Sequence, residues 1–289
     1  EGGSGLVRGT TFHAPFTDPA NPLTIYKGTG AFTFTRAHDA THTATFVHPT
    51  TGLVTAASAD QLRIEAQGAL IEGARTNLCL RSATLGTTWA PTNVTVSTDN
   101  ATSPDGAVNA ERLTATAGNG TLIQDLGVIA SAAKTFSIYL KRANGAGNIQ
   151  LTLNGGTGWT TVAVTSAWAR YSLTATLADP DVGIRIVTDN DAVFTWGAQM
   201  EDGAAFASSY IPTTTTAMAR NADSLSFPTS GNISDAEGSV SVAANNDSSY
   251  NSTRLVVTDM VSVNPPLYRT GNTLVIFDGV NPAYGPVSW

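Results

Sequence analysis

The chain has 289 residues and 42% of them are hydrophobic, so it is long enough to bury a sizeable core. Only 13% of the residues are charged, about half the usual share, and the formal net charge is −7. With no basic stripe and no arginine-rich segment, the composition argues against nucleic-acid binding. No apolar run reaches the roughly 18 residues that a membrane-spanning helix needs, so membrane insertion is not expected either.

Residues 1–67 are predicted to form an extended N-terminal arm that carries a β-hairpin. Glycine and proline are frequent in residues 1–30, which excludes a long helix there. Further on, phenylalanines alternate with threonines ahead of a turn at residues 49–52, after which Leu53–Ala56 starts another strand. Strands this few cannot bury a core of their own. The arm is therefore expected to pack on the main domain or on a neighbouring copy, as a docking or oligomerisation element.

Residues 68–82, GALIEGARTNLCLRS, are predicted to form a strand, a corner and a second strand. Glu72 and Arg75 flank the corner, and we expect a structural ion pair between them. Glycosidase chemistry at Glu72 would need a second carboxylate about 5–10 Å away, for which the sequence supplies no convincing partner. The lone Cys79 lies between two leucines and is most simply a small buried hydrophobe.

Residues 68–227 are predicted to form one jelly-roll β-sandwich. Short segments rich in β-branched residues recur every 10–15 residues or so, without helical periodicity and with turn residues between them. The predicted strands are Asn93–Thr98, Ala110–Thr116, Thr121–Leu126, Thr135–Arg142, Asn148–Leu153, Thr160–Thr165, Arg170–Leu177, Gly183–Thr188 and Ala192–Gln199. In the last of these, Phe194 and Trp196 are predicted to share the face that points into the core.

Residues 228–289 are predicted to form a β-hairpin region, with strands that include Arg254–Thr258 and Thr273–Asp278. About 60 residues of hairpins are marginal as a free domain. Either the natural chain continues, or these strands complete a core across a subunit boundary. The predicted fold class is thus all-β, an antiparallel jelly-roll sandwich with an extended N-terminal arm and a short C-terminal β region.

Two tryptophans are candidates for a carbohydrate site, which needs an aromatic platform beside planar hydrogen-bonding groups. Trp159 follows a glycine-rich turn, where its ring would stand exposed at a loop; the alternative is a ring folded over the edge of the sandwich. Trp89 begins the first loop of the domain, and the same two alternatives apply to it.

A structural calcium ion is one interpretation of the acidic loop near residue 190, because hard oxygen ligands such as Asp189 and Asp191 gather there. Aspartate in turns needs no metal to explain it, so the two readings stay open. No other cofactor is predicted. The sequence has no serine-centred elbow, no zinc-ligand spacing and no phosphate-binding glycine loop, so we expect no catalytic residues and no enzymatic activity.

Several motifs occur in an order typical of one group of proteins. They are FTFTRAHDAT, TGLV at residues 51–54, GALIEGARTNL, SPDGAVNAERLTAT, FSIYLKR, WARYSLT and WGAQMEDGAAFASSYIPT, the last running into RNADSLSF. Over roughly residues 31–240 the chain resembles bacteriophage-type virion proteins with a carbohydrate-binding-module-like jelly roll. These proteins occur as tail fibres, capsid decorations and head spikes, including the head spikes of gene-transfer agents.

The resemblance implies a virion structural protein at the surface of an extracellular particle, a homo-oligomer with a trimer favoured, and other virion proteins as partners. It also implies that residues 237–243 correspond to the opening strand of a concanavalin-like sandwich. Three alternative functions are compatible with the sequence. The jelly roll attaches the particle to host cell-surface polysaccharide, or it is purely structural, or it is the accessory module of a secreted glycan-degrading enzyme.

Overall fold

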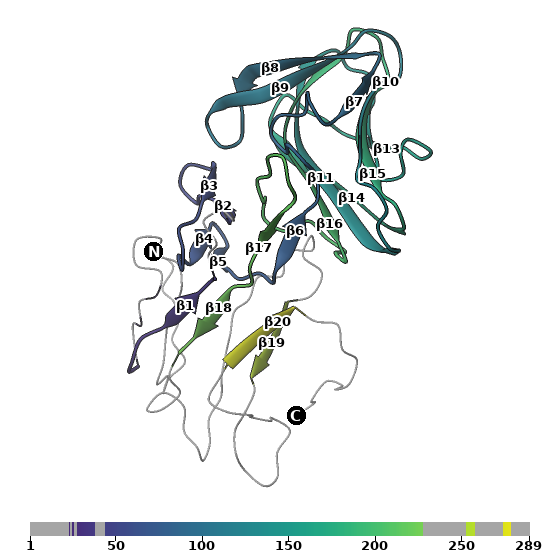
Figure 1. Ribbon diagram of the computed structural model, residues 1–289. Coiled ribbons are helices and arrows are strands. Elements are labelled where there is room, and N and C mark those ends of the chain that lie inside the picture. Colours follow the sequence, from purple (N-terminus) through teal and green to yellow (C-terminus); the bar gives the residue numbers. More distant parts are fainter. Residues whose placement is uncertain are drawn as a thin grey trace, which may run out of the picture. The chain divides into compact units, whose positions relative to one another are not determined.

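The computed structural model describes residues 23, 25, 28–37 and 44–227, together with the strands Thr253–Val257 and Leu274–Asp278. Every regular element in these ranges is a β-strand, as Figure 1 shows. Within them there is no helix of the length and apolarity that crossing a membrane requires. The prediction of an all-β protein is confirmed.

The chain divides into two compact units whose limits differ from the predicted boundaries after residues 67 and 227. The sandwich unit consists of His38–Ser58 and Ala74–Asn221, and the terminal unit of Glu1–Ala37, Ala59–Gly73 and Ala222–Trp289. The hairpin of the predicted arm thus belongs to the sandwich unit. The boundaries differ because strand pairing between distant segments joins them, and such pairing leaves no mark on composition.

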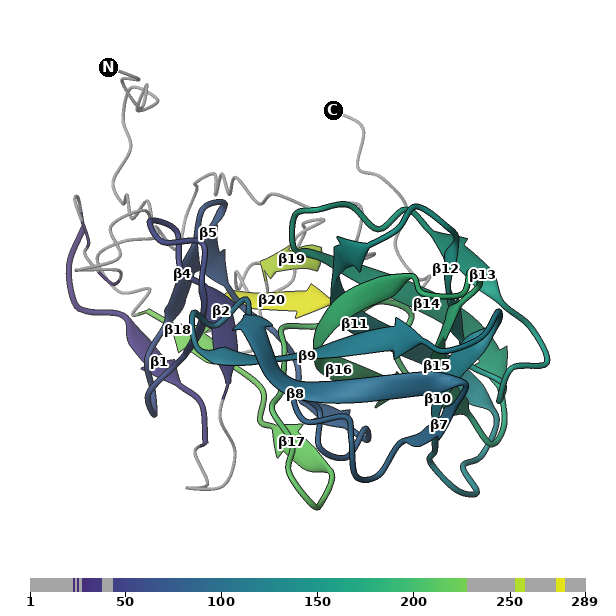
Figure 2. The ribbon, with the colours of Figure 1, turned by 90° about the horizontal axis from the view of Figure 1, so that it is seen from above.

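The sandwich unit contains two five-stranded antiparallel sheets, which form the two layers seen at the upper right of Figure 1 and from above in Figure 2. The first sheet has the order β13 (Thr160–Val162), β12 (Ile149–Thr152), β15 (Asp181–Ile186), β10 (Gly120–Asp125) and β7 (Ala90–Thr92). The second sheet has the order β14 (Ala169–Leu177), β11 (Ala132–Asn144), β16 (Ala192–Asp202), β9 (Val108–Ala115) and β8 (Val94–Thr102). Every strand predicted between residues 93 and 199 overlaps one of these, which confirms the antiparallel sandwich.

Alternating apolar residues of both sheets form the main core between the layers. The central members are Leu113, Leu122, Phe136, Ile138, Leu140, Ile149, Leu151, Val182, Ile184 and Ile186, all at most 1% exposed. Burial of each such side chain contributes roughly 1.5–3 kcal/mol. Cys79 belongs to the same core and is fully buried, which raises the pKa of its thiol above the ordinary value. Its predicted role as a small hydrophobe is confirmed.

The outer face of the second sheet is covered by other segments of the same unit. Trp196 and Ala110 pack there against Val54 and Tyr210, with the Trp196 and Tyr210 ring centroids 4.6 Å apart. Val54 comes from the hairpin of β2 (Thr45–Val47) and β3 (Val54–Ala56). The outer face of the first sheet carries exposed and half-buried side chains instead.

The prediction that Phe194 and Trp196 share the face that points into the core is confirmed only in part, because Trp196 is buried in a hydrophobic cluster but on the other face of the sheet, and Phe194 is only half-buried. Val193 and Ala198 enter the main core instead. The register between β11 and β16 shifts opposite this stretch, and Gly197 has a φ of +66°. A bulge of this kind inverts the alternation of side chains, and strict period-two reasoning cannot anticipate it.

The described residues of the terminal unit form three strand pairs. They are β1 (Thr33–Thr35) with β18 (Ser224–Ser226), β4 (Arg63–Glu65) with β5 (Gly68–Leu70), and β19 (Thr253–Val257) with β20 (Leu274–Asp278). The last pair confirms two strands predicted in the C-terminal region; the strand predicted at residues 237–243 lies outside the described residues. Phe34, Leu62 and Ile64 form a small apolar cluster in this unit.

The structure corrects the predicted ion pair between Glu72 and Arg75, because it gives both side chains other partners. Arg63 donates to Glu72 Oε2 at 2.7 Å and to Asp223 Oδ2 at 2.5 Å, and Arg36 donates to Asp223 Oδ1 at 3.0 Å. Arg75 belongs to the sandwich unit, where its Nε lies 3.9 Å from Glu201 Oε1. Glu72 therefore stabilises the packing of strands in the terminal unit, whereas Arg75 lies near Glu201 in the sandwich unit.

Glu111 on β9 is a buried carboxylate from which a pH dependence of stability follows. It is 1% exposed, and its Oε2 accepts the N–H of Leu85 at 2.7 Å. Burial raises its pKa from 4.5 to about 7, against the opposing N–H groups of Leu85 and Gly86. The proton is held more tightly in the folded chain, so this contribution is fully present below about pH 4.5 and is lost as the pH rises to about 7.

We expect Glu111→Gln to remove this fall in stability, because glutamine keeps an oxygen acceptor for Leu85 and does not ionise. The measurement is the thermal unfolding midpoint at pH 5 and pH 8 at constant ionic strength. Asp189→Asn, at an exposed position, is the control, and its unfolding midpoint should change with pH as that of the unmodified chain does. Equal pH dependence in the Glu111→Gln variant and the unmodified chain would contradict the expectation.

Candidate functional site

A continuous row of polar side chains crosses the outer face of the first sheet. Gln150 stands opposite both Thr161 and Arg185, and Thr121 stands opposite both Arg185 and Thr92. The neighbours of these residues along β10, β12 and β15 lie in the main core, so alternation directs the row outward. Five strands at about 4.8 Å spacing give the row a span of about 19 Å.

Trp159 stands beside this row because of the loop between β12 and β13. Gly155 and Gly156 both have positive φ, and the Gly156 N–H donates to Thr152 Oγ1 at 3.2 Å. The side-chain Oδ1 of Asn154 accepts the N–H of Gly158 at 2.8 Å, which closes the turn. A Cβ on Gly156 would come within 3.0 Å of the indole ring, so glycine is what lets the ring lie against the loop.

Arg185 links the tryptophan to the row. Its guanidinium carbon lies 4.6 Å from the centroid of the Trp159 ring, within the range of cation–π contacts. Its Nε donates to Gln150 Oε1 at 2.6 Å, and Gln150 Nε2 donates in turn to Thr161 Oγ1 at 3.0 Å. One aromatic ring and two planar polar groups are thus held in fixed positions on a sheet face. We call Trp159, Arg185, Gln150, Thr161 and Thr121 the Trp159 face.

The Trp159 face has the chemistry of a binding surface for polyhydroxylated molecules. The indole is half-buried against Arg185 and the Gly156 turn, and its remaining exposed part offers an apolar surface. The amide, guanidinium and hydroxyl groups offer donors and acceptors for hydroxyls. The face brings together no nucleophile and base in hydrogen-bond contact, which covalent catalysis requires. In the part of the chain that the structure describes, no group of three or more His, Cys, Asp and Glu side chains is arranged to hold a metal.

The prediction of Trp89 as a sugar-stacking residue is corrected by its burial. Its ring belongs to the main core and is only 3% exposed, and its indole N–H donates to the carbonyl of Leu80 at 3.3 Å. A ring with both faces packed leaves no surface for a ligand. Of the two predicted tryptophans, the structure therefore places only Trp159 on an outer face.

Asp191, a predicted calcium ligand, has a different role in the structure. Its Oδ2 accepts the N–H of Gly147 at 2.6 Å and lies 3.6 Å from Nη1 of Arg142. The carboxylate thus joins the loop at residues 145–147 to the start of β16. Asp189 is exposed, and its Oδ1 accepts the N–H of Asn190 at 2.9 Å. Both aspartates accept backbone N–H groups of turns.

Sequence reasoning missed Arg185 and Gln150 as members of the site. Both lie within strands that were predicted, at positions where a polar residue interrupts apolar ones. That alternation was a signal that both side chains point outward. Their position opposite each other depends on the pairing of β12 with β15, which lie more than 30 residues apart in sequence.

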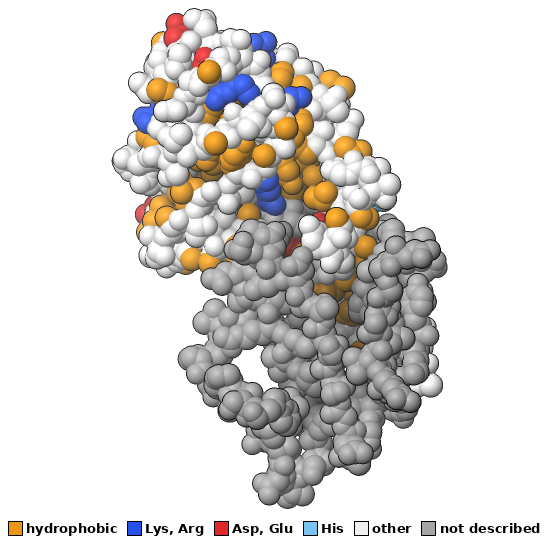
Figure 3. Space-filling model, turned by 180° about the vertical axis from the view of Figure 1, so that it is seen from behind, with side chains coloured by type: hydrophobic (Ala, Val, Ile, Leu, Met, Phe, Trp, Pro, Cys, Tyr) orange, Lys and Arg blue, Asp and Glu red, His pale blue; other side chains and the backbone are white. Residues whose placement is uncertain are grey.

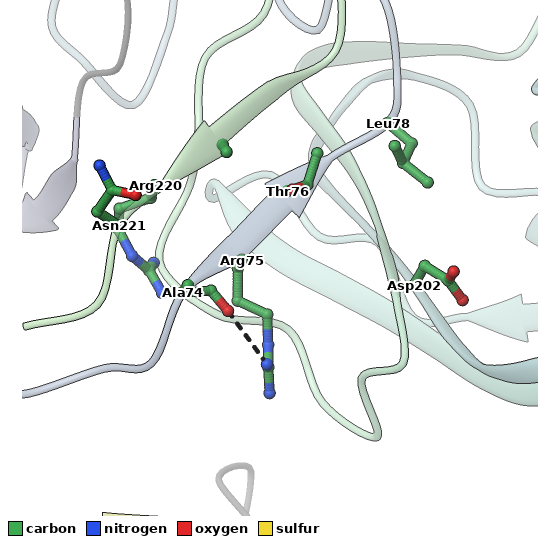
Figure 4. A pocket seen from close by; sticks show the side chains of 8 residues that line it. Ala74, Arg75, Thr76, Leu78, Asp202, Arg220 and Asn221 are labelled. Carbon is green, nitrogen blue, oxygen red and sulfur yellow. Dashed lines mark hydrogen bonds between the residues drawn. The ribbon is translucent and has the colours of Figure 1, made fainter. Parts of the chain in front are cut away.

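The sandwich unit also contains a hollow with a volume of about 350 Å³. It is lined by residues of β6 (Arg75–Asn77), β17 (Met218–Arg220) and the end of β16. Figure 4 shows the Arg75 side chain extending from β6 into this hollow, with Asp202 on its far side. Its charged groups already have partners: Asp202 accepts from Lys134, and Arg220 Nη1 donates to Ser209 Oγ at 2.7 Å. We therefore interpret the hollow as a contact region between strands, in which the charged side chains stabilise the fold.

One face of the molecule carries its positive charge in scattered positions. On the face shown in Figure 3, the lysine and arginine side chains lie in small separate groups among polar and apolar ones. This distribution agrees with the net charge of −7 and offers no continuous track for a phosphate backbone.

No protein-family model matches the sequence, and no curated protein matches it. Among solved structures, the xylan-binding domain CBM22-1 of Paenibacillus barcinonensis Xyn10C covers 46% of this chain and 99% of its own, at 17% identity and a TM-score of 0.38. A variant of the family 29 carbohydrate-binding module CBM29-2, complexed with cellulohexaose, matches 46% of this chain and 93% of its own length, at 11% identity and a TM-score of 0.34. The enzymatically active domain of bacteriophage CBA120 tailspike protein 4 covers 43% and 21%, at 10% identity and a TM-score of 0.33. The chain is thus similar, over less than half of its length, to carbohydrate-binding modules and to part of a phage tailspike.

Proposed function

We propose that the sandwich unit binds polysaccharide through the Trp159 face, as a non-catalytic part of a protein on a virion surface. The observation that carries the proposal is the fixed arrangement of Trp159, Arg185 and Gln150 on an outer sheet face. The role is attachment to the host cell surface.

The chemistry of the face favours a glycan over other extended polymers. Sugar rings present apolar C–H faces to aromatic rings and hydroxyls to planar polar groups, and this face holds one aromatic ring beside two planar polar groups. A row that crosses five strands matches an extended chain better than a compact ligand. Nucleic acid is disfavoured because the net charge is −7 and most of the row is uncharged.

The virion role is supported by the order of the sequence motifs between residues 31 and 240. It includes a homo-oligomeric assembly with a trimer favoured, contacts to other virion proteins, and a place on the outside of an extracellular particle. The purely structural alternative predicts that Trp159 is buried between chains of the assembly. The accessory-module alternative requires a catalytic domain elsewhere in the same polypeptide.

We expect Trp159→Ala to weaken glycan binding by the full chain at least tenfold, about 1.4 kcal/mol or more, because the apolar part of the surface is lost. The measurement is a glycan array that includes xylan, cellulohexaose and host capsular polysaccharide, followed by titration with the best ligand. Phe194→Ala, at a half-buried aromatic residue on the other sheet, is the matched control and should bind normally.

Two results would count against this function. One is the absence of binding to every glycan on the array, which would favour the structural role. The other is unchanged affinity in the Trp159→Ala variant, which would place the glycan elsewhere. An unchanged unfolding midpoint in that variant shows that any loss of affinity is local.

A further inference from the structure

We propose that the Trp159 face selects glycans that carry carboxylates, such as uronic acids, and that Arg185 is the residue that binds the acid group. This inference rests on the proposed glycan binding and specifies its substrate class. It assigns Arg185 a specificity-determining role distinct from the apolar contribution of Trp159.

Arg185 forms no ion pair with any residue the structure describes. Some other basic side chains in those ranges do, such as Arg63 with Glu72 and Asp223 and Lys134 with Asp202, whereas Lys141 and Arg170 do not. Arg185 is half-buried at the centre of an outer sheet face, and its hydrogen bond goes to a neutral amide. Its positive charge is therefore available to an acidic ligand.

The guanidinium group of Arg185 is also oriented to receive a carboxylate. The stack on Trp159 at 4.6 Å and the Nε bond to Gln150 at 2.6 Å hold the guanidinium plane in one orientation. Within the described residues, the two terminal Nη groups form no hydrogen bond. A planar fork with free terminal donors matches the two oxygens of a carboxylate, which it can bind in bidentate fashion.

The surrounding charges limit where the acid group can lie. Asp125 and Asp181 stand opposite each other at the far end of β10 and β15, four residues from Arg185 and so about 13 Å along the strand. Burial and the neighbouring Asp125 raise the pKa of Asp181, so that end repels a further carboxylate. A uronate would place its acid group at Arg185 and its hydroxyls toward the aspartates.

Long-range electrostatic attraction to the whole chain cannot account for a preference for acidic glycans. The whole chain has a net charge of −7, so an acidic polymer is repelled overall at low ionic strength. Any preference for an acidic glycan over its neutral counterpart must come from a local contact. This makes matched pairs of ligands an informative test.

The experiment is affinity electrophoresis of the full chain in gels that contain polygalacturonate, alginate or cellouronate, each beside its carboxyl-reduced form. We expect at least one acid form to bind on the order of 10- to 100-fold more tightly than its reduced form, as a hydrogen-bonded charge pair allows. Arg185→Gln should abolish this preference, and Arg185→Lys should retain only part of it. Lys141→Gln removes the same charge from the other sheet and should leave the preference intact.

Each outcome decides between the two claims. Equal binding of the acid and reduced forms, or a preference that survives Arg185→Gln, overturns the role of Arg185 but leaves glycan binding through Trp159 standing. If no form binds and the array also shows no ligand, the proposed function fails and this inference fails with it. Binding of a reduced form by Arg185→Gln shows that the variant is folded.

Discussion

Replacing Asn77 with leucine is expected to lower the free energy of unfolding of the sandwich unit by about 4 kcal/mol or more. Asn77 is fully buried, and its side chain serves four backbone groups. Its Nδ2 donates to the carbonyls of Ala198 at 3.0 Å and Ile211 at 2.8 Å, and its Oδ1 accepts from the N–H groups of Cys79 at 3.0 Å and Met200 at 3.1 Å. Leucine has a similar size but leaves all four groups unsatisfied, at about 1–3 kcal/mol each.

The measurement for Asn77 is urea unfolding followed by tryptophan fluorescence, because Trp89 and Trp196 are buried in this unit. Asn148→Leu, at an exposed position, is the matched control and should change stability by about 0.5 kcal/mol or less. A midpoint for Asn77→Leu close to that of the control would show that these hydrogen bonds are replaceable.

Arg63→Met is expected to destabilise the terminal unit by about 3–5 kcal/mol. Arg63 is fully buried, and burial alone would lower the pKa of its guanidinium, but Glu72 and Asp223 outweigh this and raise it. Removal of the arginine takes away the cation that these two buried carboxylates share, and Arg36 remains beside Asp223. The network joins Ala59–Gly73 to the segment that begins at Ala222, so its loss should loosen both.

Hydrogen exchange measured by mass spectrometry is suited to Arg63, because it reports on peptides from residues 59–73 and 222–227 separately. These peptides should exchange faster in Arg63→Met, whereas peptides from the main core should not change. Arg185→Met, at a half-buried arginine outside any described ion pair, is the control. Additional removal of Asp223, as Arg63→Met with Asp223→Leu, should recover part of the loss because fewer uncompensated charges remain. Unchanged exchange in the single variant would mean that the network contributes little.

Much of the secondary structure follows from local sequence. The strands between residues 93 and 199 were predictable because each has its own alternation and is bounded by turn residues such as Asn154–Gly155. The burial of Cys79 followed from its apolar neighbours. These features depend on residues a few positions apart, so no knowledge of partners is needed.

The candidate site was predictable only in part. The glycine-rich turn before Trp159 indicated a ring beside a loop, and in the structure that ring is half-buried against Gly156 and Arg185. The same reasoning failed for Trp89, because a tryptophan after a polar segment can equally fold inward over the core. Arg185 and Gln150 could be placed on the outside of their strands, but their contact depends on which strands pair.

The sequence by itself determined that the chain is β-structure, where most strands of the sandwich lie, and that one tryptophan stands at a glycine-rich loop. Only the tertiary structure decided that Glu72 contacts Arg63, that Arg75 lies near Glu201, and that Trp196 faces away from the main core. The physical reason is range. Alternation and turn chemistry act between neighbours in sequence, whereas ion pairs, bulges and cross-strand rows depend on a register set by segments tens of residues apart.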